Sequence, residues 1–349
     1  MPDNLVFVCS TASDDAGVYG VRVDTDSAAL SRTDALPVER PTHLAVHPDG
    51  GTLYAANRTD GGRVSAFDID ADAGAVSRVG DVDSGGAGPC YVSVDPAGRF
   101  VFAANYDGGT VAMCPLDGDG RPTDPTSVVE HDGSGVVAGR QDAPHPHSVV
   151  PGPDGEFVYV PDLGTDRVVA YRVEDEHDAL VPVPKADAVL PDGAGPRHLA
   201  FGPDGDTAYV VNELNATLTS LDVDARGHLT VRDHASTLPD GVDALASQCA
   251  DVHVHPSGAW VYASTRGHDS IAVFDAHDPA ALDRTATVPT GGAKPRDFAL
   301  DPLGDLLLAA NRDSDTLVPF RVDADDGTLE RAGSACALPR PTCAAFVEE

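Results

Sequence analysis

The hydrophobic and polar positions of the chain follow one pattern that occurs six times. Each copy begins with a small residue or proline, continues with a short apolar run, turns at a PDG-like segment and returns through a second apolar run that ends at asparagine or a substitute. The copies are RPTHLAVHPDGGTLYAANR, GPCYVSVDPAGRFVFAANY, HPHSVVPGPDGEFVYVPDL, GPRHLAFGPDGDTAYVVNE, CADVHVHPSGAWVYASTR and KPRDFALDPLGDLLLAANR. Short apolar runs bounded by turn residues are typical of β-strands. Each copy therefore predicts two antiparallel strands.

The spacing between copies is that of a propeller blade. From Asn57 to Asn311, the residues that end the second runs lie roughly 45 to 57 residues apart, and repeats of about 40 to 50 residues are typical of β-propellers. A third and a fourth strand follow, for example TLTSLDVD and HLTVRDH, and four strands make one blade. No long segment shows the periodicity of an amphipathic helix. The pattern thus predicts an all-β fold.

The two ends of the chain each supply part of one more unit. RPTCAAF near the C-terminus resembles the first strand of the repeat, and LVFVCST near the N-terminus resembles the second. Together they complete a blade that closes the ring and removes the exposed strand edges of an open array. The sequence therefore predicts a seven-bladed β-propeller, with residues 1–349 as a single domain and the ring closed by strands from both termini.

Acidic residues dominate the composition. There are 56 acidic and 23 basic residues, which gives a net charge of −33, and 47 of the acids are aspartate. A field of this sign repels phosphates and argues against nucleic acid or an anionic membrane as a partner. Lysine-poor, aspartate-rich surfaces are typical of proteins from salt-loving organisms, so we expect most acids to lie on solvated faces.

The chain shows no signal for export, membrane insertion, metal or cofactor. The start of the sequence lacks a basic leader with a long apolar run, and no segment reaches the roughly 20 apolar residues of a membrane span. The six cysteines form no CxxC pair, and His253 and His255 lie on one strand without a third ligand nearby. We expect a cytoplasmic protein with no bound metal and no cofactor.

Repeat geometry gathers certain residues at one face. The first strand of a blade runs from one face of the ring to the other, and the second strand returns. The start of the first and the end of the second therefore lie at the same mouth of the central channel. Arginine makes up 21 of 349 residues (23 basic residues less two lysines), so 14 such positions should hold about one; they hold five, together with one histidine. Arginine suits two-pronged binding of a carboxylate or phosphate. The alternative is that these arginines pair with aspartates of neighbouring blades.

Four mouth residues on neighbouring blades form a candidate catalytic group: His147, Arg197, Glu213 and Arg266. A histidine and a glutamate beside a bound carbonyl can move protons, and two arginines can stabilise developing negative charge. Such a set can open or close a lactone ring. The candidate substrate-binding residues on the same rings are Arg58, Tyr106, Asp251, Arg296 and Arg312. Because side chains at a channel mouth are exposed to solvent, we expect substitutions there to change the free energy of unfolding only a little.

Several stretches, taken in order, resemble the lactonase family of seven-bladed propellers. They are HPHSV, GPRHLAF, VVNEL and STRGHDSI, with AANYDGGTV before them and KPRDFALDPLGDLLLAANRDSDTL after them. The resemblance extends from Leu5 to Phe346. The family includes propeller-type bacterial 6-phosphogluconolactonases and fungal carboxymuconate cyclases. The active site of the cyclase branch is built from a histidine, two arginines and a glutamate, and the resemblance places these roles on His147, Arg197, Glu213 and Arg266.

The resemblance implies a metal-independent hydrolase of an anionic sugar lactone, similar to 6-phosphogluconolactonase. The arginines would bind the substrate and polarise its carbonyl, while either His147 or Glu213 activates water. One alternative is a lactonising cyclase of the carboxymuconate type. Another is a non-catalytic propeller that binds a ligand or protein at its mouth, although aromatic residues make up only 5% of the chain, which disfavours a protein-binding rim. The expected partner is a small lactone or anionic sugar acid, and the sequence indicates no particular protein partner.

The net charge also predicts how stability depends on salt. At −33, self-repulsion opposes the compact state, and added salt shortens the range of that repulsion from about 10 Å at 0.1 M to about 3 Å at 1 M. We therefore expect the melting temperature to rise as potassium chloride increases from tenths molar to molar. Thermal unfolding followed by circular dichroism measures this, and a melting temperature that stays flat would contradict the prediction.

Overall fold

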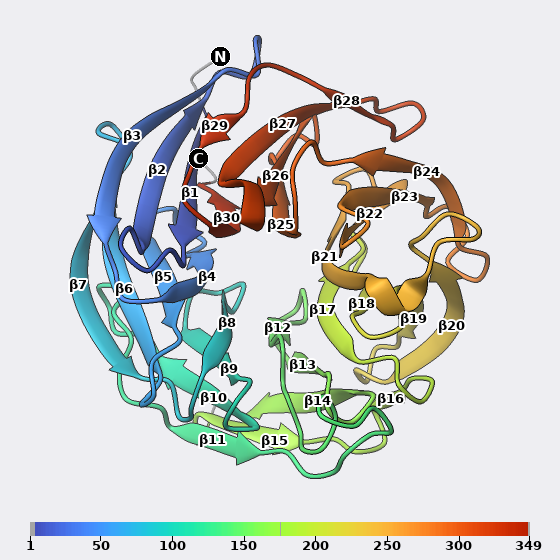
Figure 1. The fold of residues 1–349 in the computed structure, drawn as a ribbon. Coiled ribbons are helices and arrows are strands. Elements are labelled where there is room, and N and C mark those ends of the chain that lie inside the picture. The colour runs from blue at the N-terminus through green and yellow to red at the C-terminus, as the bar shows by residue number, and fades with distance from the viewer. Residues whose placement is uncertain (1–3, 175, 348–349) are drawn as a thin grey trace.

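Seven antiparallel sheets surround a central channel in the computed structural model, which describes residues 4–174 and 176–347 (Figure 1). Six sheets use strands that follow one another in the sequence, and the seventh combines both ends of the chain. The predicted seven-bladed propeller is therefore confirmed. Two 3-10 turns, η1 (Ala244–Ala246) and η2 (Arg312–Ser314), are the helical segments of the described chain. Neither is long enough to cross a bilayer.

The strands of each blade lie in chain order from the channel outward. Blade 1 contains β4 (Pro41–Val46), β5 (Thr52–Asn57), β6 (Arg63–Asp70) and β7 (Ala75–Asp83). Blade 2 contains β8 (Pro89–Val94), β9 (Phe100–Asn105), β10 (Thr110–Pro115) and β11 (Ser127–Glu130). Blade 3 contains β12 (Val150–Pro151), β13 (Phe157–Asp162), β14 (Arg167–Glu174) and β15 (Ala179–Pro182), with β16 (Ala188–Val189) also paired to β14.

The remaining blades repeat this arrangement, except that blade 7 begins with the last strand of the chain. Blade 4 contains β17 (Pro196–Phe201), β18 (Thr207–Asn212), β19 (Thr217–Val223) and β20 (Leu229–Ser236). Blade 5 contains β21 (Gln248–Val254), β22 (Trp260–Arg266), β23 (Ser270–Asp275) and β24 (Asp283–Pro289). Blade 6 contains β25 (Pro295–Leu300), β26 (Leu306–Asn311), β27 (Thr316–Val322) and β28 (Leu329–Arg331), with β29 (Cys336–Ala337) also paired to β27. Blade 7 contains β30 (Pro341–Phe346), β1 (Asn4–Ser10), β2 (Gly17–Val23) and β3 (Leu30–Pro37).

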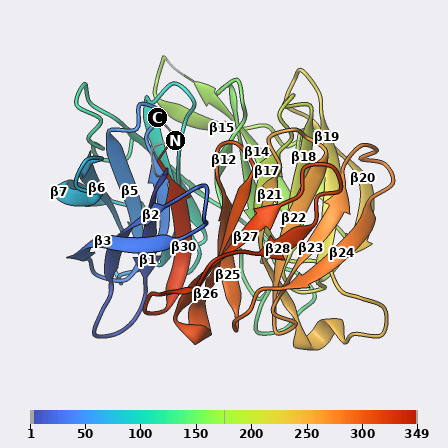
Figure 2. The same ribbon diagram turned by 90° about the horizontal axis from the view of Figure 1, so that it is seen from above.

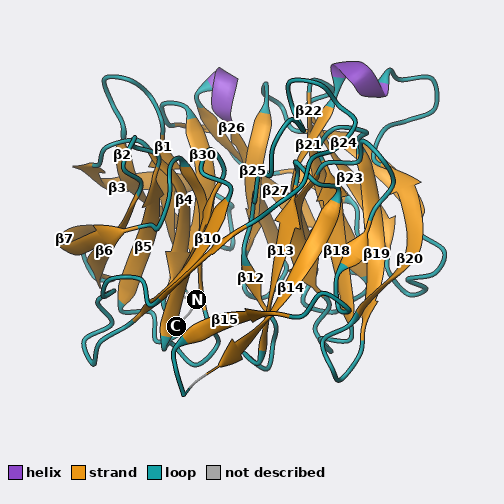
Figure 3. Cartoon of the chain, turned by 90° about the horizontal axis from the view of Figure 1, so that it is seen from below, coloured by secondary structure: helices purple, strands orange, loops and turns teal. Residues whose placement is uncertain are grey.

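Blade 7 closes the ring as the sequence predicts. Its innermost strand comes from the C-terminal end and pairs antiparallel with β1, so that Phe7 lies opposite Ala345 and Val8 lies opposite Ala344. Figure 1 shows β30 beside β1 and the other blades continuing the circle, and Figure 2 shows the same ring from its edge. Figure 3 shows the two 3-10 turns at one face, which is the mouth, while β1 begins and β30 ends toward the other face.

The hydrophobic core is divided among the spaces between blades. Seven clusters of buried apolar side chains are found, and each one joins two neighbouring blades. Between blades 7 and 1, for example, Phe7 packs with Leu53 and Phe67, all of them fully buried. Both faces of a middle strand such as β5 are buried for this reason. A blade therefore has no complete core of its own.

In blades 1, 2 and 6 the recurring asparagine ties the second strand to the connection that precedes the blade. The side-chain amide of Asn57 donates a hydrogen bond to the carbonyl of Glu39 at 2.8 Å. Asn105 donates to Ser84 at 2.7 Å and Asn311 donates to Thr290 at 3.2 Å. Buried backbone carbonyls in such connections need a donor, and the amide supplies it.

The inner strands share a bulge at the residue after their first proline. In blade 4, Pro196 pairs with Asn212 and His198 pairs with Val211, so Arg197 has no opposite residue. The same shift occurs in blades 1, 2 and 6. A bulge re-aims the extra side chain, and at this end of the strand it lies at the mouth.

Blade 3 has a much shorter inner strand than the sequence pattern predicts. The segment HPHSVVPGP contributes only the two-residue β12. Its prolines lack the N–H groups that a strand ladder needs. The N–H of His147 nevertheless donates to Pro161 at 2.9 Å, which holds this residue beside β13 at the height of the other bulges.

Candidate active site

A compact group of charges surrounds Glu213, which follows β18. Arg266 Nη2 donates to Oε2 of Glu213 at 2.7 Å, and Arg197 Nε lies 3.2 Å from the same oxygen. Arg140 donates to Oε1. Arg197 and Glu213 are only 2% and 4% exposed. The expectation that these mouth residues are exposed to solvent is therefore wrong. The structure thus brings together three of the four predicted catalytic residues and adds a third arginine.

Arg140 is a site residue that the sequence analysis missed. It lies in the loop of residues 131–149 between β11 and β12, outside the repeat pattern. Its side chain is one-third exposed, whereas that of Arg266 is 9% exposed. Arginine is not rare enough in this chain to single out one loop position, so no signal in the sequence could have identified it.

The arginines decide the ionisation state of Glu213. Burial by itself would raise the pKa of this carboxyl, but the charges of Arg266, Arg197 and Arg140 lower the pKa to about 2. The carboxylate is therefore ionised at neutral pH, and both of its oxygens are engaged by guanidinium groups.

His147 lies on the neighbouring blade at the same height. Its ring is 5.4 Å from the Tyr106 ring, measured between centroids, and its Nδ1 is 3.8 Å from Cys90 Sγ. Burial, together with the nearby charge of Arg197, holds the pKa of His147 well below the usual range. The imidazole is neutral at pH 7. Within the described residues, its Nε2 makes no hydrogen bond.

The other predicted substrate-binding arginines fall into two classes. Arg58 forms a two-pronged pair with Asp107 at 2.7 and 2.9 Å, and Arg312 pairs with Asp313 at 2.7 Å. These contacts match the alternative of arginine–aspartate pairs. Arg296 differs, because it forms no hydrogen bond or ion pair with any part of the chain that the structure describes. Burial and the charges of Arg197 and Arg266 lower its pKa.

Asp251 does not occupy the mouth position assigned to it. In β21, Cys249 takes the place of the usual proline and pairs with Thr265, while Val252 pairs with Ala263. Ala250 therefore corresponds to Arg197 of blade 4, and Asp251 corresponds to His198, one residue deeper in the channel. The repeat alignment was shifted by one residue because the copy CADVHVHP lacks the proline that marks the start.

A hydrogen-bonded chain connects the mouth with this deeper layer. Arg197 Nη1 lies 2.9 Å from His198 Nε2, and His198 Nδ1 lies 2.7 Å from an oxygen of Asp251. The other oxygen of Asp251 lies 3.1 Å from His253 Nε2. Arg197 also donates to the carbonyl of Ala250 in the next blade. These contacts hold the Arg197 guanidinium in one position.

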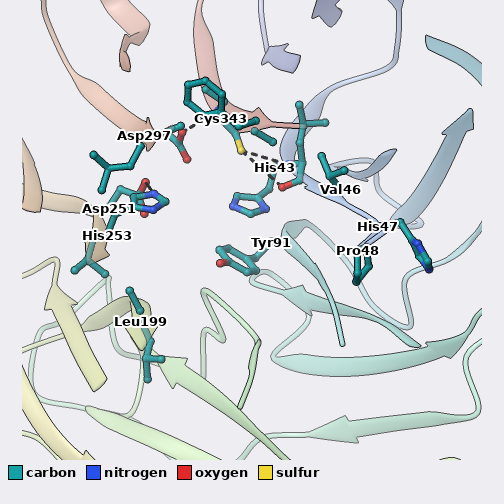
Figure 4. A pocket seen from close by; sticks show the side chains of 18 of the residues that line it. His43, Val46, His47, Pro48, Tyr91, Leu199, Asp251, His253, Asp297 and Cys343 are labelled. Carbon is teal, nitrogen blue, oxygen red and sulfur yellow. Dashed lines mark hydrogen bonds and ion pairs between the residues drawn. The ribbon is translucent and has the colours of Figure 1, made fainter. Parts of the chain in front are cut away.

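A cavity of about 530 Å³ lies below the mouth, toward the face where the chain ends lie. Figure 4 shows its lining, which includes His43, Tyr91, Asp251, Asp297 and Cys343. Each of these five residues directly follows the bulged residue of the inner strand of its blade. The described residues contain one group with metal-ligand chemistry and suitable proximity, formed by three of these side chains.

The burial of Glu213 generates a prediction about stability. Glu213→Gln keeps the shape but leaves the buried guanidinium groups without a counter-charge, and loss of one partner of a buried ion pair costs about 3–5 kcal/mol. Because the folded pKa lies near 2, below the usual 4.5, this contribution is complete above about pH 4.5 and is lost as the pH falls toward 2. The gap in unfolding free energy between wild type and variant should therefore shrink over that window.

Chemical denaturation at several pH values measures this gap. Glu156→Gln, on an exposed turn, is the matched control and should show almost no gap. A Glu213→Gln variant as stable as wild type at pH 7 would contradict the ion-pair account.

Comparisons with known proteins agree with this fold along nearly the whole chain. A family model described as "Lactonase, 7-bladed beta-propeller" matches residues 4–346. A 6-phosphogluconolactonase of Bacillus subtilis is 34% identical over 95% of both chains, and one of Formosa agariphila is 31% identical over 88% of this chain and 87% of its own. The structure of a periplasmic gluconolactonase of Pseudomonas aeruginosa superimposes with a TM-score of 0.92 at 28% identity, covering 99% of each chain. The chain thus belongs to the lactonase family of seven-bladed β-propellers.

Proposed function

We propose that this protein hydrolyses an anionic sugar lactone of the 6-phosphogluconolactone type at its mouth. The observation that carries the proposal is the gathering of Arg140, Arg197, Arg266 and Arg296 around the single carboxylate of Glu213. Four positive charges face one negative charge there, in a chain whose net charge is −33. An unpaired guanidinium such as that of Arg296 suits a phosphate or carboxylate. The relatives named 6-phosphogluconolactonase support the same substrate class.

His147 acts as the general base in this proposal. A neutral imidazole with a free Nε2 can accept a proton from water, and burial keeps the ring neutral. Glu213 is less suited, because guanidinium groups already occupy both of its carboxylate oxygens. The role of Glu213 is to fix the orientation of Arg197 and Arg266. Of the two residues that the sequence left open as the base, His147 is therefore the one we propose.

Hydrolysis then proceeds in two steps, addition and collapse. Water adds to the lactone carbonyl carbon while His147 takes one of its protons, and the carbonyl electron pair moves to oxygen. A guanidinium group stabilises that oxyanion. When the intermediate collapses, the bond from the carbonyl carbon to the ring oxygen breaks, and the imidazolium returns its proton to the ring oxygen. The new carboxylic acid loses its proton to solvent, which leaves a hydroxy acid anion.

The chemistry is proposed to need no metal. Within the candidate catalytic group only His147 and Glu213 carry atoms that ligate metals, and the Glu213 oxygens are already bound by arginines. Location in the cytoplasm and adaptation to high salt stay predictions, and the second rests on the net charge alone.

The proposal predicts a preference for phosphorylated lactone. Wild type should hydrolyse 6-phosphogluconolactone with a higher kcat/KM than gluconolactone, because the arginines contact the added charge. His147→Ala should lower kcat by at least about a hundredfold, as is typical for loss of acid–base assistance. His228→Ala, at the opposite face on the β19–β20 turn, is the control. Rates corrected for spontaneous hydrolysis provide the measurement, and full activity of His147→Ala would exclude the mechanism.

Metal independence is tested separately. After exhaustive treatment with EDTA in molar potassium chloride, the lactonase rate should stay within twofold of the untreated rate. Loss of activity that is restored by added calcium or zinc would show that a metal takes part in the reaction.

A further inference from the structure

The channel contains a second ring of side chains one residue below the bulges. Among these, His43, Asp297 and Cys343 come from β4, β25 and β30, the inner strands of the consecutive blades 1, 6 and 7. One ligand atom from each residue lies within 4.8 Å of the other two. Figure 4 shows the three side chains directed into the same part of the cavity. None of them belongs to the proposed lactonase site.

The local contacts leave one ligand atom free on His43. Nδ1 of His43 lies 3.1 Å from the carbonyl oxygen of Val92 and 3.5 Å from the backbone nitrogen of the same residue. We assign the proton to Nδ1 because the contact with the carbonyl is the shorter one. The ring also stacks on Tyr91, with centroids 3.8 Å apart, and Nε2 is left for a ligand. A histidine that binds metal commonly donates its other nitrogen to a backbone carbonyl in this way.

Asp297 is a buried carboxyl group without a cationic partner among the described residues. It is 4% exposed, and its Oδ1 accepts a hydrogen bond from the Ala344 N–H at 2.9 Å. It forms no ion pair with any described residue, and the second buried aspartate, Asp251, lines the same cavity. Burial and the nearby charge of Asp251 raise the pKa of Asp297 well above its usual range, so the carboxyl group of the metal-free protein carries a proton. A cation bound between these strands would displace that proton and pair with the carboxylate.

The third group is the thiol of Cys343, which is 2% exposed. The N–H of Leu44 points to its sulfur at 3.3 Å, and the carbonyl of the same residue lies 3.9 Å from it. Burial raises the pKa of this group, so it is a thiol in the metal-free protein. A bound metal would displace the thiol proton, and the Leu44 N–H would then donate to the thiolate. An imidazole, a carboxylate and a thiolate are each ligands that zinc accepts, whereas magnesium and calcium prefer oxygen ligands alone. The fourth position of a tetrahedral ion would face the open cavity, where water can occupy it.

We propose that His43, Asp297 and Cys343 bind a zinc ion in the central channel, where it joins the closing blade to its two neighbours. The ion binds folded protein and bridges three blades, so it stabilises the closed ring. It takes no part in lactone hydrolysis. The site is therefore separable from the proposed function, and either proposal can fail without the other.

The test measures zinc binding to the full-length protein. Metal-free protein in molar potassium chloride with a phosphine reductant is titrated with zinc against a chromophoric chelator, with excess magnesium present to occupy surface aspartates. Wild type should bind one zinc per chain. Cys343→Ser and Asp297→Asn should each weaken binding at least about tenfold, because loss of a direct ligand should matter at least as much as loss of a supporting contact. The control is Cys114→Ser, at a buried cysteine that does not line the cavity, and this variant should bind zinc as wild type does.

Two further measurements distinguish the loss of a zinc ligand from poor folding of a variant. Zinc should raise the melting temperature of wild type by several degrees and leave those of Cys343→Ser and Asp297→Asn unchanged. Cobalt added to wild type should give the near-ultraviolet charge-transfer absorption of a thiolate ligand, and this absorption should be missing with Cys343→Ser. Absence of stoichiometric zinc in reduced wild type would overturn the proposal, as would equal affinity of wild type and Cys343→Ser.

Discussion

The whole structure depends on the fact that a blade cannot bury its own hydrophobic faces. Each of the seven core clusters belongs to two blades, so every blade is stabilised only by its neighbours. An open array would leave two apolar faces in water as well as unpaired strand edges. The ring removes both, and this explains why the first and the last strand of the chain pair with each other.

The same architecture supplies the chemistry. The repeating bulge turns one residue of an inner strand toward the mouth in several blades, and the next residue faces the channel below. Side chains at these positions contribute little to the clusters between blades. Arg197 and Arg296 can therefore differ from Thr42 and Cys90 at the same positions without disturbing the packing. The first layer carries the positive charges around Glu213, while the second carries histidines and carboxylates.

The sequence predicts the fold well because the fold is repetitive. Blade number and ring closure follow from repeat counting, and the alignment also brought Arg197, Glu213 and Arg266 to one place. It failed by one residue at Asp251, where the proline that marks the strand start is replaced by Cys249. Arg140 lies in a loop without repeats, so only the three-dimensional path of the chain brings it to Glu213.

Two other features had no signal in the sequence for physical reasons. The burial of Glu213 depends on how closely three arginines pack around it, which residue types alone do not reveal. Most of the chain separates His43 from Asp297 and Cys343, and the three approach one another only when the ring closes, so no ligand spacing exists to be recognised.

The pairing of β1 with β30 has a consequence for how the protein is made. The first strand leaves the ribosome early, but its partner β30 begins only at Pro341. One edge of β1 therefore stays unpaired while the more than 300 intervening residues are synthesised. Contacts so distant in sequence form slowly, and an unpaired edge in a nascent chain can join a neighbouring copy instead. The yield of closed rings therefore depends on two quantities. One is the concentration of chains whose β1 edge is still unpaired, and the other is the rate at which β30 is synthesised.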